Sequence, residues 1–387
     1  MILGVLAEAA EGERRVALVP AVVPRMKALG IEVIVERGAG GAAGFPDADY
    51  ASAGARLAGS AAAVLAEAQM LASVGAAAGQ PHALRSGQAI VGLLDPLGDA
   101  ERIARLAARG VTAFALELLP RLSRAQPMDA LTSMATIAGY RAVLLAAGTL
   151  TRMFPLMMTA AGTVTPARVF VVGAGVAGLQ AIATAKRLGA AVAAYDVRPD
   201  VAEQVESLGA RFVDLDLDAS GTEDAGGYAR AMGSDFYDRQ RELLADVVAE
   251  SDAVVTTAAV PGRRAPLLVT AAAVARMRAG SVIVDLAAGT GGNCALTRPG
   301  RSVDARGVTI LGPLNLPADL PFDASQMYAR NVAAFLEHVV REGELAVAAG
   351  DEIVRGALVA HGGEVVHPRV REQLGLPPLG AAREEGG

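Results

Sequence analysis

Short apolar runs recur along the chain, and glycine, proline or polar residues separate them. Strands that are buried on both faces of a parallel sheet have this pattern, because neither face alternates with water-facing residues. Apolar residues at helical spacing predict helices over 21–29 and 270–277 and a long helix over 325–340. The alternation over 351–368 predicts a terminal pair of strands. The runs that predict strands lie at 1–7, 31–36, 169–172, 253–257, 281–286 and 308–311.

Two stretches in the first half of the chain have weaker counterparts in the second half. MKALGIEVIVE at 26–36 corresponds to AKRLGAAVAAYD at 185–196, and ASAGARLA at 51–58 corresponds to ESLGARFV at 206–213. Such a repeat indicates two related β–α–β units. We therefore predict an α/β fold of two Rossmann-like lobes, each a doubly wound parallel sheet, with a cleft between them.

Breaker residues suggest where the chain passes from one lobe to the other. Gly139 marks the first crossing, and Pro317 with Pro321 marks the second. The first lobe is predicted to contain residues 1–130 plus 325–387, and the second to contain residues 140–320. The long helix predicted over 325–340 would carry the chain back to the first lobe.

The most specific motif is RVFVVGAGVAGLQAIATAKRLGAAVAAYD at 168–196, in which a strand, a GxGxxG turn, a helix and a second strand follow one another. Gly173 allows the tight turn, Gly175 lets the backbone approach a pyrophosphate, and Gly178 lets helix and sheet pack closely. Asp196 ends the second strand, where a carboxylate accepts hydrogen bonds from the adenosine ribose. The acid favours NAD(H), because a 2′-phosphate would meet like charge.

Composition excludes several other classes of protein. The chain has 387 residues, a formal net charge of −6 and a single cysteine, Cys294. Arginine and lysine do not cluster, which argues against a nucleic-acid partner. One cysteine and scattered histidines provide neither a disulfide framework nor a metal site. The apolar segment 169–185 is interrupted by glycine, and the N-terminus lacks the basic residues of a signal peptide, so we expect a soluble cytoplasmic chain.

A polar cluster precedes an apolar helix in RLSRAQPMDALTSMATIAGYRAV at 121–143. Arg121, Gln126, Asp129 and Thr132 can project from a loop and a first helical turn, where Asp129 is favourable near the helix N-terminus. Spacing alone is equally compatible with an ordinary capped helix. The position at the lobe junction favours a ligand site, because ligands of open α/β sheets bind outside the carboxyl ends of the strands.

A second polar stretch, GTEDAGGYARAMGSDFYDRQR, occupies 221–241. The pair Gly226 and Gly227 before Tyr228 provides a hinge and an aromatic ring that can close over a cofactor. An ordinary surface excursion is the alternative. No residue of this stretch has the pattern of a nucleophile with its base.

Taken together, these segments carry a family resemblance that extends from GERRVALVP at 12–20 to the dipeptide at 367–368. The chain closely resembles the NAD(H)-binding alpha subunit of proton-translocating NAD(P) transhydrogenase, in the split alpha-1 form that ends before any membrane segment. Further segments that carry the resemblance are YDVRPDVAEQVESLGARFV, AGGYARAMGSDFYDRQ, VTTAAVPGRRAPLLVT, GSVIVDLAAGTGGNCALT and DEIVRGALVAHGGEVVHP.

The resemblance implies a homodimer and an NAD(H) site in the second lobe. It places the nicotinamide-side catalytic positions at Arg121, Gln126 and Asp129, with Thr132 replacing a serine of the family pattern. The pocket-wall residue Ala259 departs from a common leucine, which puts the tightness of that wall in doubt. The cofactor-binding positions that it implies are Gly173, Gly175, Val176, Gly178, Asp196, Val197, Arg198, Gly227, Tyr228, Met232, Gln240, Thr257 and Ala259.

The reaction implied by the resemblance is direct hydride transfer between NADH and NADP⁺ held on a partner beta subunit. A membrane-spanning subunit would couple this transfer to proton translocation, and the chain would be peripheral to the inner (plasma) membrane. Such chemistry requires no metal, nucleophile or covalent intermediate, because the protein has to position two nicotinamide rings and exclude water.

Two other functions are compatible with parts of the pattern. Alanine dehydrogenase is similar in fold and sequence, but an amino-acid dehydrogenase needs a positioned acid or base. In that family a lysine and a histidine serve, and here 70–79 and 90–98 contain neither; Asp95 stands where the histidine is expected, and Arg15 remains. A non-catalytic NAD(H)-binding module is the third possibility. Hydride exchange with an NADP-binding partner would exclude it.

Overall fold

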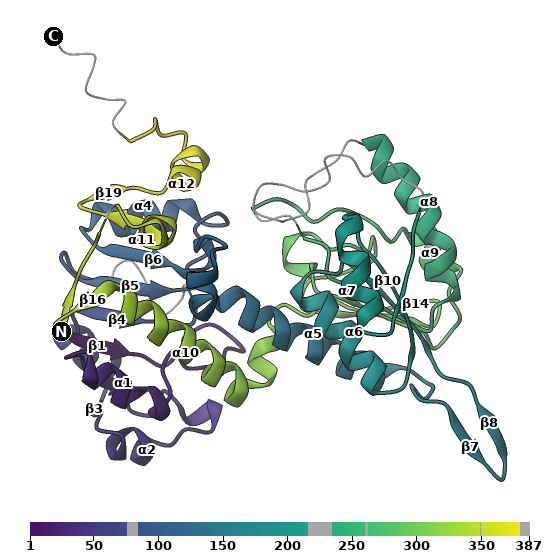
Figure 1. Ribbon diagram of the computed structural model, residues 1–387, viewed down its shortest axis with the longest axis horizontal. Helices are drawn as coiled ribbons and strands as arrows, with labels where there is room; N and C mark the ends of the chain where they lie inside the picture. Colours follow the sequence, from purple (N-terminus) through teal and green to yellow (C-terminus); the bar gives the residue numbers. More distant parts are fainter. Residues whose placement is uncertain (76–83, 216–233, 260–261, 349, 380–387) are drawn as a thin grey trace. The chain divides into compact units, whose positions relative to one another are not determined.

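The chain divides into two compact units, and each has its own parallel sheet. The computed structural model describes residues 1–75, 84–215, 234–259, 262–348 and 350–379 (Figure 1). Unit 1 consists of Met1–Met134 together with Ala318–Gly387, and unit 2 consists of Ala135–Pro317. The chain therefore leaves the first unit once and returns to it.

Unit 1 contains an eight-stranded sheet in the order β19-β18-β6-β5-β4-β1-β2-β3. Its first six strands are parallel, and the C-terminal strands join antiparallel at the β6 edge, as the yellow ribbon of Figure 1 shows. The strand order reverses between β1 and β4, which is therefore the topological switch point. The strands are β1 (Ile2–Val5), β2 (Glu32–Glu36), β3 (Arg56–Ala58), β4 (Met70–Ala72), β5 (Ala89–Gly92), β6 (Thr112–Ala115), β18 (Leu358–His361) and β19 (Glu364–Val365).

Helices pack on this sheet through side chains that the strands bury on both faces. Ile34, Leu71 and Ile90 belong to one core cluster with Ile103 and Leu106 of α4. Such two-sided burial explains why the strands are continuous apolar runs. A short hairpin, β16 (Val340–Arg341) and β17 (Glu344–Leu345), follows α10. The helices are α1 (Val23–Ala28), α2 (Asp47–Ser52), α3 (Ala61–Glu67), α4 (Ala100–Ala108), α10 (Pro321–Val339), α11 (Glu352–Ala357) and α12 (Pro368–Gln373), and the 3-10 turns are η1 (Pro20–Val22), η2 (Gly41–Ala43), η3 (Leu116–Leu118) and η4 (Ser123–Met128).

The strand pair predicted over 351–368 is only half correct. The second part forms β18 and β19, but the first part is helix α11. Asp351 is the cause, because its Oδ1 accepts hydrogen bonds from the backbone N–H groups of Ile353 (2.8 Å) and Val354 (3.1 Å). An N-cap of this kind satisfies donors that a strand would have paired otherwise.

Unit 2 contains a seven-stranded sheet in the order β11-β10-β9-β12-β13-β15-β14. All neighbouring pairs are parallel except β14 with β15. The strand order reverses between β9 and β12, so the switch point lies beside the glycine-rich turn. The strands are β9 (Arg168–Val172), β10 (Ala191–Tyr195), β11 (Arg211–Phe212), β12 (Ala253–Thr256), β13 (Val282–Asp285), β14 (Ser302–Ala305) and β15 (Val308–Leu311).

Alternate side chains of β9 point to opposite faces of this sheet and enter different cores. Val169 and Val171 pack in the cluster that contains α5, α6 and α7, whereas Phe170 and Val172 pack in the cluster that contains α8 and α9. Helices α8 and α9 lie side by side in Figure 1. The elements are α5 (Ala130–Thr149), α6 (Val176–Arg187), α7 (Ala202–Ser207), α8 (Ser234–Glu250) and α9 (Ala271–Ala275), with 3-10 turns η5 (Pro199–Val201), η6 (Ala288–Thr290) and η7 (Leu316–Asp319).

Helix α5 is apolar because unit 2 packs against it. Among the described residues it is the helix whose length and mean hydropathy of 1.4 would be sufficient to cross a membrane. Ala142, Val143 and Ala146 are fully buried in the core of unit 2. A Cβ on Gly139 would lie 2.1 Å from the carbonyl oxygen of Ala177, so glycine allows α5 and α6 to approach closely. These contacts are those of a core helix.

The hairpin β7 (Met157–Thr159) and β8 (Gly162–Val164) extends away from the sheet of unit 2 (Figure 1). All of its strand residues are exposed. Met158 is 78% exposed, and Met157 and Val164 also present apolar side chains to solvent. Large apolar side chains that project in this way indicate a surface for association.

Candidate nucleotide-binding site

The turn after β9 has a backbone geometry that glycine makes possible. Gly173 has φ +96°, and its N–H donates to the carbonyl oxygen of Tyr195 at 2.7 Å. A Cβ on Gly173 would lie 2.6 Å from Thr257 Oγ1, and a Cβ on Gly178 would lie 1.8 Å from Gly173 O. The first glycine therefore makes the turn, and the third lets α6 start directly on it.

Gly175 differs from the other two glycines because the space beside it is open. No protein atom lies within 4 Å of where its Cβ would be. Gly175 is the N-cap of α6, no side chain caps this helix, and its first turn has no acidic residue. The first N–H groups of α6 and the positive end of its dipole are therefore available to an anion.

Asp196 connects the glycine-rich turn to the turn after β10. Its Oδ2 accepts from the N–H of Ala174 at 2.7 Å, and its Oδ1 accepts from the N–H of Arg198 at 2.9 Å. The Arg198 guanidinium donates to both carboxylate oxygens, at 2.9 and 3.0 Å. Asp196 is 8% exposed, and Val197 beside it is half-buried. The predicted ribose acceptor thus also orders the loop that surrounds it.

Thr257 and Ala259 follow β12 on the other side of the switch point. Thr257 Oγ1 donates to Gly173 O at 3.0 Å, which links the end of β12 to the glycine-rich turn. Ala259 is exposed. The parallel pairing of β12 with β9 places the carboxyl ends of both strands at the same edge of the sheet.

A buried carboxylate below this edge was not singled out from the sequence. Asp285, at the end of β13, is fully buried. Its Oδ1 accepts from Thr256 Oγ1 (2.9 Å) and Ala287 N–H (3.0 Å). Its Oδ2 accepts from Thr297 Oγ1 (2.7 Å) and Asn293 N–H (2.8 Å). The position of an acid directly after a buried strand was the available signal.

Asn293 extends this network to the loop after β12. Its Nδ2 donates to the carbonyl oxygens of Ala258 and Pro266, both at 2.8 Å. Asn293 is itself fully buried. The loop that contains the predicted pocket wall is therefore tied at two points to the Asp285 network.

Gln240 lies on α8, and its side chain faces the protein interior. Its Nε2 donates to Tyr195 Oη at 2.7 Å, and the residue is 2% exposed. Burial raises the pKa of Tyr195 to about 12. This contact ties α8 to β10. The other predicted loop positions, Gly227, Tyr228 and Met232, lie outside the described residues, as do Gly226 and most of the stretch 221–241.

The predicted nicotinamide-side residues lie in unit 1, on and around η4. Asp129 follows η4, and its two carboxylate oxygens accept from Thr132 N–H (2.8 Å) and Thr132 Oγ1 (2.6 Å). Arg121 and Gln126 are exposed. The structure thus brings Asp129 and Thr132 into contact and confirms the helix-capping interpretation. The role of these residues toward a ligand stays a prediction.

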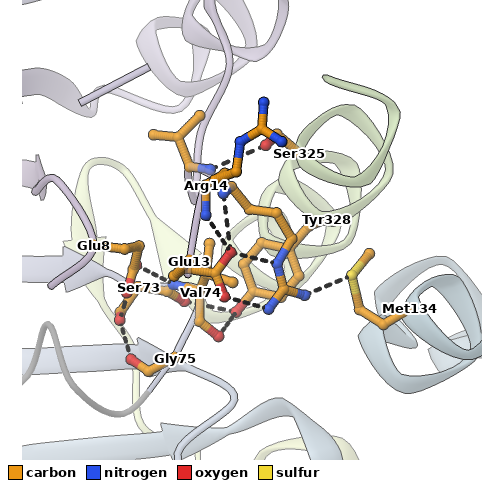
Figure 2. A network of polar contacts seen from close by, with 11 residues as sticks. Glu8, Glu13, Arg14, Ser73, Val74, Gly75, Met134, Ser325 and Tyr328 are labelled. Atoms are coloured by element: carbon orange, nitrogen blue, oxygen red, sulfur yellow. Dashed lines mark hydrogen bonds and ion pairs between the residues drawn. The ribbon is translucent and has the colours of Figure 1, made fainter. Parts of the chain in front are cut away.

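At the switch point of unit 1 the protein places its own carboxylate instead of an open glycine-rich turn. Glu8 follows β1, and its Oε1 accepts from the N–H of Val74 (2.6 Å) and from Ser73 Oγ (3.3 Å), which follow β4 (Figure 2). Burial raises the pKa of Glu8 to about 7, although the Val74 hydrogen bond acts in the opposite direction. A carboxyl group here occupies the region where a Rossmann unit binds an anion.

The same figure shows how this switch point is tied to two helices. Arg15 forms a buried ion pair with Glu13 at 2.6 Å, and its Nη1 contacts Met134 Sδ of α5 at 3.0 Å. Tyr328 Oη of α10 donates to Ser73 O at 2.6 Å (Figure 2). Ser325 Oγ of α10 accepts from Val16 N–H at 3.0 Å. The segment after β1 is therefore held against both helices.

A second acidic pair lies at the ends of β5 and β6. Glu117 Oε1 accepts from Asp95 N–H at 2.5 Å, and Asp95 has φ +49°. Burial raises the pKa of Glu117 to about 7 and also raises the pKa of Asp95. Within the described ranges, no three His, Cys, Asp or Glu side chains are grouped as metal ligands.

Comparison with known proteins covers nearly the whole chain. Residues 4–138 match the family model "Alanine dehydrogenase/PNT, N-terminal domain", and residues 142–368 match "Alanine dehydrogenase/PNT, C-terminal domain". The chain is 45% identical to the first of the two chains that form the NAD(P) transhydrogenase alpha subunit of Rhodospirillum rubrum, over 96% of this chain and 100% of that protein.

Solved structures agree with this result. Transhydrogenase from Sinorhizobium meliloti superimposes with a TM-score of 0.83 at 42% identity, over 95% of this chain and 99% of that chain. An L-alanine dehydrogenase superimposes with a TM-score of 0.81 at 28% identity, over 97% of this chain and 99% of that chain. The Rossmann-like architecture predicted from the sequence is thereby confirmed.

Proposed function

The chain belongs to the alanine dehydrogenase/PNT family of NAD(H)-binding proteins, and we propose that it is the NAD(H)-binding subunit of a proton-translocating transhydrogenase. The reaction is direct hydride transfer between NADH and NADP⁺ bound on a partner subunit. The observation that carries the proposal is the uncapped N-terminus of α6 behind Gly175, with Asp196 ending the next strand. Full-length similarity to a transhydrogenase subunit supports it.

The residues of this turn fit a dinucleotide. A pyrophosphate needs backbone N–H donors and room for its oxygens, and α6 with Gly175 provides both. Asp196 would accept from the adenosine ribose, and Val176, Val197 and Arg198 would line the adenine side. Bound NADH supplies the hydride, and the protein supplies binding and orientation.

On the nicotinamide side, the proposal assigns Arg121, Gln126, Asp129 and Thr132 to orienting the redox ring. Thr132 retains the hydroxyl of the serine that it replaces. Its contact with Asp129 fixes the start of α5, so that the polar groups of this turn have defined positions. Such positioning lowers the barrier without covalent chemistry, because the reacting groups are already oriented.

The loop residues Gly227, Tyr228, Met232 and Gln240 complete the proposed cofactor contacts, with Thr257 and Ala259 on the β12 side. Gln240 is best suited to an indirect role, because its side-chain amide is buried against Tyr195. Thr257 likewise contacts the glycine-rich turn directly. These two residues support the geometry of the turn from opposite sides of β9.

The proposed partners are an NADP(H)-binding beta subunit and a membrane-spanning subunit, which would hold this chain at the cytoplasmic face of the inner (plasma) membrane. We also propose a homodimer. The exposed apolar side chains of the β7–β8 hairpin support self-association, because contact with a second chain would remove them from water.

Alanine oxidation is the alternative that the fold itself would allow. That reaction needs a group that accepts and donates a proton at the substrate. The expected lysine and histidine are replaced, and Asp95, at the histidine position, is turned toward its own loop by a hydrogen bond from Gly98 N–H at 3.2 Å. Incubation with L-alanine and NAD⁺ should therefore produce no NADH absorbance.

The proposal is tested by mixing this chain with the NADP(H)-binding component and following NADH-dependent reduction of an NADP⁺ analogue. Gln126→Ala should bind NADH but transfer hydride about ten- to hundredfold more slowly. Undiminished transfer in this variant would contradict the nicotinamide-side assignment. Binding of NADH without any exchange in the wild type would instead favour a non-catalytic module.

A further inference from the structure

We propose that Asn331 of α10 is a positioning residue that fixes η4, the segment that contains Gln126. This inference rests on the proposed function, because η4 matters to hydride transfer only if Gln126 orients the nicotinamide. Asn331 is 7% exposed, and its Nδ2 donates to the carbonyl oxygen of Pro127 at 2.8 Å. The acceptor therefore belongs to the residue directly after Gln126.

The bond restrains a peptide unit that lies between the two proposed ring contacts. Pro127 has a fixed φ, so its conformation depends mainly on the orientation of its carbonyl group. Asn331 holds that carbonyl group, and the next peptide units lead through Met128 to Asp129. Rotation about this point would displace Gln126 relative to Asp129, which is anchored at the start of α5 by Thr132.

The other contacts of η4 are less directional. Ala125 and Met128 are buried beneath it, so apolar packing holds the segment down but leaves its peptide groups free to tilt. Arg124 lies 3.7 Å from Asp351 Oδ2 and 4.0 Å from Glu352 Oε2, and its side chain is 55% exposed. Exposed pairs at such distances contribute little. The buried Asn331 bond is the contact that sets direction.

The other half of the Asn331 amide indicates why an amide is needed here. Its Oδ1 is buried and has no hydrogen-bond partner among the residues that the structure describes. An unpaired buried acceptor is unfavourable, and leucine, of similar volume, would avoid that cost. The contribution of the residue is therefore concentrated in the donor that it presents to Pro127.

Two variants separate positioning from folding. Asn331→Leu removes both the donor and the unpaired acceptor, and Asn331→Asp keeps the shape but places an acceptor opposite the Pro127 carbonyl. Arg330→Gln is the matched control, because Arg330 is the exposed neighbour on the same helix. Each full-length chain would be examined for thermal unfolding, NADH affinity, hydride transfer to an NADP⁺ analogue on the NADP(H)-binding component, and hydrogen–deuterium exchange of residues 123–129.

We expect both Asn331 variants to exchange faster at 123–129 and to transfer hydride about ten- to hundredfold more slowly. Their NADH affinity should stay within about threefold of wild type, because the dinucleotide turn is in unit 2. Arg330→Gln should match wild type in every measurement. A leucine variant that folds normally and still transfers hydride at the wild-type rate would overturn the inference.

The same assay distinguishes this failure from failure of the proposed function. If wild type transfers hydride, and Gln126→Ala is slow while both Asn331 variants are fast, only the positioning role of Asn331 is wrong. If the wild-type chain binds NADH and transfers none, the proposed function is wrong, and the positioning role is overturned with it. Faster exchange at 123–129 without slower transfer would show a purely structural contact and would also contradict the inference.

Discussion

Arg198 donates hydrogen bonds from its guanidinium to both carboxylate oxygens of Asp196, at 2.9 and 3.0 Å. The two side chains are 14% and 6% exposed, so the pair is largely shielded from solvent. Asp196 also accepts from the N–H of Ala174 in the glycine-rich turn. One carboxylate therefore sets the shape of the turn and carries the negative charge of the proposed ribose site.

Asp196→Asn should weaken NADH binding by about ten- to hundredfold, because hydrogen bonds to a charged acceptor contribute roughly 1.5–3 kcal/mol. The preference for NADH over NADPH should narrow as well, since the charge that repels a 2′-phosphate is removed. Fluorescence titration with both dinucleotides measures this. Asp200→Asn, at an exposed acid nearby, is the control. Equal NADH affinity in Asp196→Asn and wild type would contradict the ribose assignment.

Gly175→Ala and Gly178→Ala should separate binding from folding. At Gly178 the new methyl would lie 1.8 Å from Gly173 O, so we expect a loss of about 1–3 kcal/mol in the free energy of unfolding. At Gly175 the methyl enters open space, so stability should change by less than about 1 kcal/mol while NADH affinity falls. Calorimetry and NADH titration give the two values. A Gly175→Ala chain that binds NADH normally would exclude close approach of the pyrophosphate.

Asp285→Asn should destabilise unit 2, because the carboxylate accepts from Thr256, Ala287, Asn293 and Thr297 in a fully buried position. An amide nitrogen would face N–H donors there. We expect a loss on the order of 3 kcal/mol, measured by urea unfolding. Asp246→Asn, at an exposed acid, should cost far less. Equal costs at the two positions would show that the Asp285 network does not stabilise the loops.

Glu8→Gln should change how stability depends on pH. The folded-state pKa of Glu8 is raised from 4.5 to about 7, so the folded chain binds the proton more tightly than the unfolded chain does. This contribution is complete below pH 4.5 and is lost as pH rises to about 7, a change of about 3 kcal/mol.

The glutamine cannot ionise, so the variant should gain stability relative to wild type between pH 4.5 and 7. Urea unfolding at several pH values measures the difference. Glu117→Gln provides a second site, because burial also raises the pKa of Glu117 to about 7. Parallel pH profiles for wild type and Glu8→Gln would contradict the protonated state of Glu8.

The fold and the glycine-rich turn were predictable because their signals are local. Gly173 and Gly178 act on atoms of the same turn, and the strands on either side are continuous apolar runs. The same locality explains the error at 351–368. Asp351 caps α11 through residues two and three positions later, a short-range signal that the alternating pattern obscured.

Contacts between distant parts of the sequence could not be predicted in this way. Asn331 reaches Pro127 across 204 positions, and Tyr328 reaches Ser73 across 255. Asn293 joins Ala258 and Pro266, which no periodicity connects. Such pairs depend on how helices and strands pack, and the sequence pattern indicates only that each of these residues is polar within an apolar region.

Transfer of deuterium tests the central claim most directly. NADH deuterated at C4, in each of its two stereoisomers, is mixed with this chain, the NADP(H)-binding component and NADP⁺, and the products are analysed by mass spectrometry. Direct transfer between the two rings predicts that one stereoisomer passes its deuterium to NADPH with no loss to water. Deuterium in the solvent, or no labelled NADPH from either stereoisomer, would contradict the account.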